Sequence, residues 1–121
     1  MTLEKVRYHH TDSSGYKRVS YPVKVKCLAT RDVVIHQERW EDDNKWTDRK
    51  DDKQGESNLK ARVKAGTTVR WEQVYRMPDT PHDGNEELYH KAWFTVRTVE
   101  TYPVTSPRSV WLQTPYTSIP N

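Results

Sequence analysis

Residues 59–71 read LKARVKAGTTVRW, and this stretch decides the fold class of the chain. From Leu59 to Ala65, small apolar side chains alternate with basic ones, a period of two that is typical of a half-buried β-strand. Gly66 follows at the position of a tight turn, and residues 67–75 continue the alternation. The stretch therefore predicts two neighbouring strands joined by a turn.

Further segments show the same alternation or a short apolar run, and β-branched and aromatic residues dominate them. They are residues 23–28, 33–35, 92–97 and 110–113. Helical spacing of apolar residues is not convincing anywhere, so only short turns are predicted, at residues 83–90 and 118–121. We expect an all-β fold of five to six mostly antiparallel strands that form a small barrel.

Length and composition predict a single domain around a small core. The chain has 121 residues, of which only 33% are hydrophobic, but five Trp and seven Tyr add apolar area. We expect residues 1–22 to form an N-terminal arm, which could add a strand, and residues 23–121 to form the barrel domain. Neither a signal peptide nor a transmembrane segment is expected. The location stays open: the cell envelope or exterior if the chain is an excised domain, and the cytoplasm otherwise.

Two hydrophilic insertions interrupt the strand pattern, at residues 36–58 and 77–91. A structureless loop of that length is uncommon in a compact domain. The first insertion is therefore either disordered or a hairpin pinned by Trp40 and Trp46.

Three motifs resemble those of bacterial Src-homology-3-like (SH3-like) domains. Residues 60–69, KARVKAGTTV, are similar to that family's basic Lys-x-Gly-Thr-x-Val segment. Residues 92–97, AWFTVR, resemble its Gly-Trp-aromatic-x-Val strand, with Ala92 in place of Gly, and residues 109–119 resemble its closing strand and terminal turn. The resemblance implies an SH3-like barrel elaborated by the two insertions. It also implies a non-catalytic module that binds peptidoglycan or its peptide stems, or attaches surface proteins to the cell envelope.

The strand alternation itself indicates where a ligand would bind. If Ala92, Phe94 and Val96 face the core, Trp93 points outward, and if Val110 and Leu112 face the core, Trp111 does too. Exposed Trp and Tyr are favoured at binding surfaces. The ligand-binding residues predicted on this basis are Trp93, Trp111, Arg97, Tyr116, Trp40 and Trp46. Arg97 suits an anionic or carboxylate-bearing ligand. The alternative is that the arm or the first insertion covers these rings as part of the packing.

No catalytic, cofactor or metal site is predicted. Cys27, the one cysteine, is in phase with the apolar positions of its strand and is expected to be a core thiol. The histidines show no helical zinc spacing, and the acidic clusters lack the order of a calcium loop. We therefore expect no enzyme activity.

Two other partner classes stay open. One is single-stranded nucleic acid, bound by stacking and charge, although the net charge is only +3. The residues that would bind it are Trp71, Trp93, Trp111, Arg62, Arg70 and Arg97. The chain could also be a protein-interaction factor of a phage or mobile element. No membrane insertion is expected.

Overall fold

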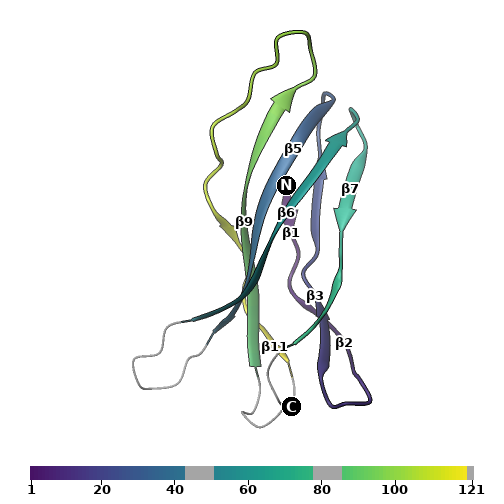
Figure 1. Cartoon of the computed structure of the whole chain (residues 1–121), viewed down its shortest axis with the longest axis vertical. Helices are drawn as coiled ribbons and strands as arrows, with labels where there is room; N and C mark the ends of the chain where they lie inside the picture. The colour runs from purple at the N-terminus through teal and green to yellow at the C-terminus, as the bar shows by residue number, and fades with distance from the viewer. Residues whose placement is uncertain (43–50, 78–85, 120–121) are drawn as a thin grey trace.

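The computed structural model of the chain describes residues 1–42, 51–77 and 86–119, and Figure 1 shows their arrangement. Within these ranges the chain forms 11 strands in three antiparallel sheets and no helix. The all-β prediction is therefore confirmed. Having no helix, this part of the chain offers none that is long and apolar enough to cross a membrane.

The strands follow one another along the chain. Their bounds are β1 (Thr2–Leu3), β2 (Arg7–Thr11), β3 (Lys17–Ser20), β4 (Val23–Lys26), β5 (Arg31–Asp42), β6 (Asp52–Val63), β7 (Thr68–Trp71), β8 (Val74–Arg76), β9 (Glu86–Thr98), β10 (Leu112–Gln113) and β11 (Thr117–Ile119). Gly66 lies between β6 and β7 with a φ of 76°, a conformation that favours glycine.

One sheet, here called the long sheet, has the strand order β10-β9-β5-β6, with β11 also paired to β9. β5 pairs with β6 on one side, from Arg31 to Glu41, and with β9 on the other, from Arg31 to Asp42. These three strands run side by side along the longest dimension of the molecule (Figure 1). After β9 the chain turns and runs back beside it to β10 and β11 (Figure 1).

The other two sheets form a second layer with one interruption. Their strand orders are β1-β4-β7 and β2-β3-β8. β1 leads into β2, β3 into β4, and β7 into β8, with only two or three residues between the members of each pair. The layer is therefore a three-stranded sheet whose strands all break at the same level.

Two apolar clusters fill the space between the layers. The first contains Val23, Val25, Val33, Ile35, Val63 and Ala92. The second contains Val6, Val19, Tyr21, Met77, Leu88 and Ile119. Leu88 and Ala92 share one face of β9, so both clusters lie on the same face of the long sheet. The opposite face of that sheet is turned away from the second layer.

Two side chains of the long sheet hydrogen-bond the backbone at the break in the second layer. Gln37 donates from Nε2 to the carbonyl oxygen of Tyr21 (3.1 Å) and to Nδ1 of His90 (2.9 Å). His90 donates from Nε2 to the carbonyl oxygen of Glu4 (2.7 Å). Tyr21 and Glu4 both lie between strands, and Pro22, which has no N–H, prevents the ladder from continuing there. Gln37 and His90 thus satisfy carbonyl groups that the break leaves inside the protein.

The predicted count of five to six strands was too low, and no closed barrel is detected among the described residues. Residues 1–22, the predicted arm, contain β1, β2 and β3, and Val6 and Val19 belong to the core. Residues 67–75, predicted as one strand, are divided between β7 and β8. Some of the extra strands are polar segments, which lack a clear apolar alternation. Others arise because the break divides each strand of the second layer into two.

The two predicted insertions are largely strand where the structure describes them. Residues 36–42 end β5 and residues 52–58 begin β6, so the two form a hairpin that carries Trp40. β9 begins at Glu86, so the turn predicted for residues 83–90 is wrong from residue 86 onward, and residues 83–85 lie outside the described ranges. The turn predicted at residues 118–121 is also wrong at Ser118 and Ile119, which belong to β11.

The segment that returns beside β9 departs from the predicted strand at 110–113. Val110, predicted to face the core, is 78% exposed, and Leu112 is half-buried. Ser109 and Ser106 accept hydrogen bonds through their hydroxyls from the N–H groups of Phe94 and Val96, both at 2.9 Å. These side chains replace part of the β-ladder, which removes the regular alternation on which the prediction for Val110 depended.

Candidate functional site

Two groups of aromatic rings, linked by Lys91, lie on the face of the long sheet that is turned away from the core. We call the two groups together the aromatic strip; it consists of Trp93, His36, Trp111, Trp40, Tyr89 and Tyr116. His36 and Trp93 are directly opposite each other on β5 and β9, and so are Trp40 and Tyr89. Directly opposed side chains on one face of an antiparallel pair lie in contact distance.

At one end of the strip, Trp93 and Trp111 both pack against His36. The ring of Trp93 stacks on His36 with a centroid distance of 5.3 Å and an interplanar angle of 27°. Trp111 meets the same imidazole edge-on at 6.0 Å and 72°. Both arrangements are favourable for aromatic pairs.

At the other end, Tyr89 is the central ring. Trp40 stacks on Tyr89 at 6.4 Å and 14°, and Tyr116 meets Tyr89 edge-on at 5.1 Å and 65°. The Tyr89 hydroxyl donates to Oδ2 of Asp51 at 2.6 Å. Burial and this carboxylate raise the pKa of Tyr89.

Two cations lie over the indoles of the strip. Lys91 Nζ is 4.7 Å from the ring centroid of Trp111 and 5.0 Å from that of Trp40, so it joins the two ends. Arg108 Cζ is 4.3 Å from the centroid of Trp93. Such contacts contribute about 0.5–1 kcal/mol each at exposed sites. The cations therefore hold the rings in place and also give the strip positive charge.

The strip offers ring area to a ligand. Trp111 is 42% exposed and Tyr116 is 47% exposed, while Trp93 and Trp40 are half-buried and Tyr89 is buried. The rings lie on the face opposite the core. Trp93 shares a side with His36, whereas its neighbour Phe94 packs against the apolar cluster on the inner side. This is the alternation that was expected for β9.

The remaining predicted ligand-binding residues lie apart from the strip or outside the described part of the chain. Arg97 is four residues beyond Trp93 on the same face of β9, near Asp32, whose pKa it helps to lower after the stronger effect of Arg62. Trp46 lies outside the described residues. Trp71, considered for nucleic-acid stacking, instead packs against the inner apolar cluster.

Acidic groups surround one end of the strip. Desolvation, followed by the nearby carboxylates of Asp51 and Glu87, raises the pKa of Asp42 to about 6. The carboxylate of Asp42, followed by burial and the carboxylates of Asp51 and Glu87, raises the pKa of Tyr116. A ligand that reaches this end therefore meets negative charge, and a polyanion is disfavoured there.

A second cluster, which the sequence did not point to, borders the strip at His36. His36 Nε2 is 3.0 Å from Glu38 Oε2 and 3.6 Å from Glu56 Oε2. Lys53 Nζ is 3.3 Å from Glu38 Oε2 and 2.6 Å from Glu56 Oε2. The available signal was His36-x-Glu38 on a strand, where residues two apart share a face. The i, i+4 spacing of zinc-binding histidines applies to helices, and so it does not detect a metal site on the strands of an all-β chain.

One serine–histidine pair resembles a nucleophile with its base, but its geometry does not suit catalysis. His9 Nε2 and Ser20 Oγ are 2.8 Å apart. Ser20 is completely buried, and its hydroxyl donates to Glu72 Oε2 at 3.4 Å. A nucleophile needs access to its substrate and a base that is oriented by a third group, and the acidic group here contacts the serine instead.

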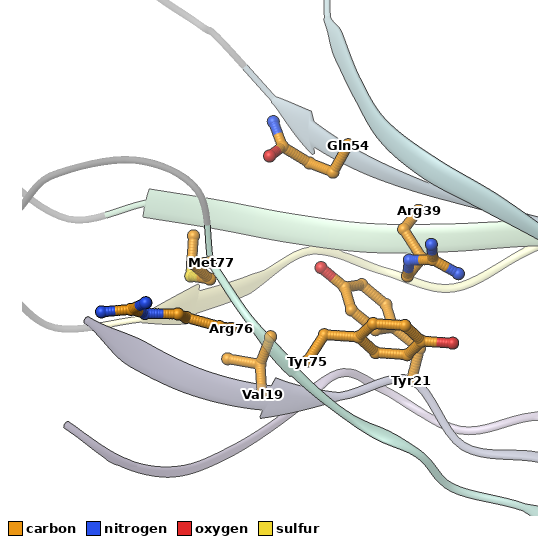
Figure 2. A pocket seen from close by; sticks show the side chains of 7 residues that line it. All are labelled: Val19, Tyr21, Arg39, Gln54, Tyr75, Arg76 and Met77. Carbon is orange, nitrogen blue, oxygen red and sulfur yellow. The ribbon is translucent and has the colours of Figure 1, made fainter. Parts of the chain in front are cut away.

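Two hollows lie on the open side between the layers. Figure 2 shows the smaller, of about 60 Å³, where Tyr21 and Tyr75 lie between Arg39 and Val19. It has room for a few water molecules. The larger, of about 280 Å³, has Arg70 and Glu72 among its lining residues. Arg70 is ion-paired with both Glu4 and Glu72, so its charge is already neutralised. The aromatic strip is therefore the better candidate site.

Comparisons with known protein families, with curated proteins and with solved structures found no match for the chain.

Proposed function

We propose that the chain is a non-catalytic binding module that recognises a cell-wall polymer, peptidoglycan, through its sugars and stem peptides. The observation that carries this proposal is the aromatic strip, with Lys91 and Arg108 over its indoles, on the face of the sheet that is turned away from the core. Sugar rings present apolar C–H faces to aromatic rings, and stem peptides carry carboxylates that cations attract.

The resemblance to SH3-like domains supports the same proposal. Gly66 has the positive φ that the turn of the Lys-x-Gly-Thr-x-Val segment requires, and Ala92 and Phe94 pack inward while Trp93 is on the other face. We propose that the fold is an elongated, open relative of the SH3-like barrel. In it, the hairpin of β5 and β6 takes the place of one insertion and extends the sheet under the strip.

Charge around the strip favours peptidoglycan over single-stranded nucleic acid. Asp42 and Asp51 lie at one end of the strip, and they would repel a chain of phosphates. Trp71 was considered for stacking on nucleic-acid bases, but it packs against the core.

Co-sedimentation with insoluble peptidoglycan tests the proposal. We expect the wild-type protein to sediment with it and Trp111→Ala to bind about 30-fold more weakly, since losing a central aromatic contact costs about 2 kcal/mol. The matched control is Val110→Ala, because Val110 is adjacent and 78% exposed but makes no ring contact with the strip; it should bind as the wild type does.

A parallel assay on single-stranded DNA cellulose covers the second partner class. We expect little retention there, whereas stacking-type nucleic-acid binding would give retention at low salt that disappears at moderate salt. Retention of that kind without sedimentation on peptidoglycan would contradict the proposal, as would equal sedimentation of wild type and Trp111→Ala.

A further inference from the structure

Three potential metal ligands converge on the solvent-facing side of β5 and β6. The ligand atoms of His36, Glu38 and Glu56 all lie within 4.8 Å of one another. Two of the separations, from His36 Nε2 to the two carboxylate oxygens, are 3.0 and 3.6 Å. Ligands of a tetrahedral zinc ion with bonds of about 2.1 Å are separated by roughly 3.4 Å, so the spacing already fits.

Regular strand geometry produces this arrangement. His36 and Glu38 are two residues apart on β5 and so share a face, and Glu56 on β6 is directly opposite Glu38. The ligand groups therefore come from paired strands of a sheet, which position them more accurately than a loop does.

Hydrogen bonds from outside the cluster orient two of the ligands. His36 Nδ1 is within hydrogen-bond distance of Asn58 Oδ1, at 3.2 Å. Trp40 Nε1 donates to Glu38 Oε1 at 3.0 Å, and this leaves Oε2 directed at His36. Metal-binding histidines and carboxylates are characteristically held in this way by a second partner.

A positive charge already lies against the two carboxylates of the cluster. The ammonium group of Lys53 contacts both Glu38 and Glu56. It also holds the pKa of Glu56 down.

We propose that His36, Glu38 and Glu56 bind a divalent transition-metal ion of the zinc type, which displaces the ammonium group of Lys53. One imidazole and two carboxylates suit Zn²⁺ better than Ca²⁺ or Mg²⁺, which prefer oxygen ligands alone. Lys53 is 37% exposed and can swing into solvent. Three protein ligands leave a fourth position open to water or to a ligand carboxylate. This site does not depend on the proposed peptidoglycan binding.

Isothermal titration of the full chain with zinc chloride tests the site. We expect one ion per chain, with Glu56→Gln binding at least about tenfold more weakly, because a charged ligand is lost. Glu56 is 52% exposed, so this variant should fold normally. The matched control is His10→Asn, a change at an exposed histidine on β2, which should leave the affinity unchanged.

Lys53→Gln separates a built site from casual binding at the surface. Removing the competing ammonium should tighten zinc binding by about fivefold or more, since the ion no longer has to displace it. If Lys53→Gln leaves the zinc affinity unchanged or weakens it, or if Glu56→Gln binds as the wild type does, the proposal is overturned. Calcium chloride in place of zinc chloride should give no comparable binding.

Discussion

Replacing His90 by leucine should lower the free energy of unfolding by about 3 kcal/mol at neutral pH. His90 is completely buried, donates to the carbonyl oxygen of Glu4, and accepts a hydrogen bond from Gln37. Leucine has a similar volume but can make neither bond. The carbonyl group of Glu4 and one N–H of Gln37 then lose their partner, at about 1–3 kcal/mol each, while Gln37 keeps its hydrogen bond to Tyr21. Urea denaturation of the wild type and the variant measures the difference.

His10→Leu is the control for this experiment. His10 is exposed on β2, so its replacement should change the free energy of unfolding by no more than about 0.5 kcal/mol. Equal stabilities of wild type and His90→Leu would show that the hydrogen bonds across the break contribute nothing. In that case the account of why the second layer can be interrupted would be wrong.

The contribution of His90 to the stability of the protein should fall as the pH is lowered from about 6.5 to about 4. Burial, the largest cause, lowers the pKa of His90 from 6.5 to about 4, although the Glu4 carbonyl acts in the opposite direction. Between these values the unfolded chain takes up a proton that the folded protein does not. The contribution is therefore fully present above pH 6.5 and is lost as the pH falls towards 4. A difference of 2.5 pKa units corresponds to about 3 kcal/mol.

The pH effect should be measured as the difference between the wild type and His90→Leu. Asp42 acts in the opposite direction, because its pKa is raised to about 6 in the folded protein and it gains stability on protonation. Asp42 is present in both the wild type and His90→Leu, so its effect cancels when the two free energies of unfolding are subtracted. The deficit of His90→Leu should therefore be about 3 kcal/mol at pH 7 and close to zero at pH 4. A deficit that is the same at both pH values would contradict a neutral, buried His90.

The strand alternation was sufficient to predict part of the fold. It located β4, the end of β6 from Leu59 onward and the later half of β9, because there apolar side chains alternate clearly with polar ones. It missed β2 because all five of its residues are exposed. It missed the start of β9 because His90, a polar residue, occupies an inward position.

The candidate site could be predicted only where it depends on that alternation. The outward position of Trp93 follows from the apolar neighbours on β9. Trp111 is exposed as well, but the reason given for it was wrong. It was expected to point outward because Val110 would face the core, and Val110 is itself exposed. The contacts of His36, Lys91 and Trp40 depend on which residue of β5 is opposite which residue of β9. That register is set by tertiary packing, and a single sequence does not contain it.

Comparison of Trp93→Ala with Phe94→Ala tests the central claim most directly, because these neighbours on β9 lie on opposite faces of the long sheet. For each variant, the free energy of unfolding and the sedimentation with peptidoglycan should be measured together. Trp93→Ala should lose less than about 1.5 kcal/mol, as expected for a surface ring, and should bind peptidoglycan much more weakly. Phe94→Ala should lose about 3 kcal/mol, as expected for a ring packed against the core, and the folded fraction should still bind. If instead Trp93→Ala unfolds the protein, or binds peptidoglycan as the wild type does, the aromatic strip is not a recognition surface.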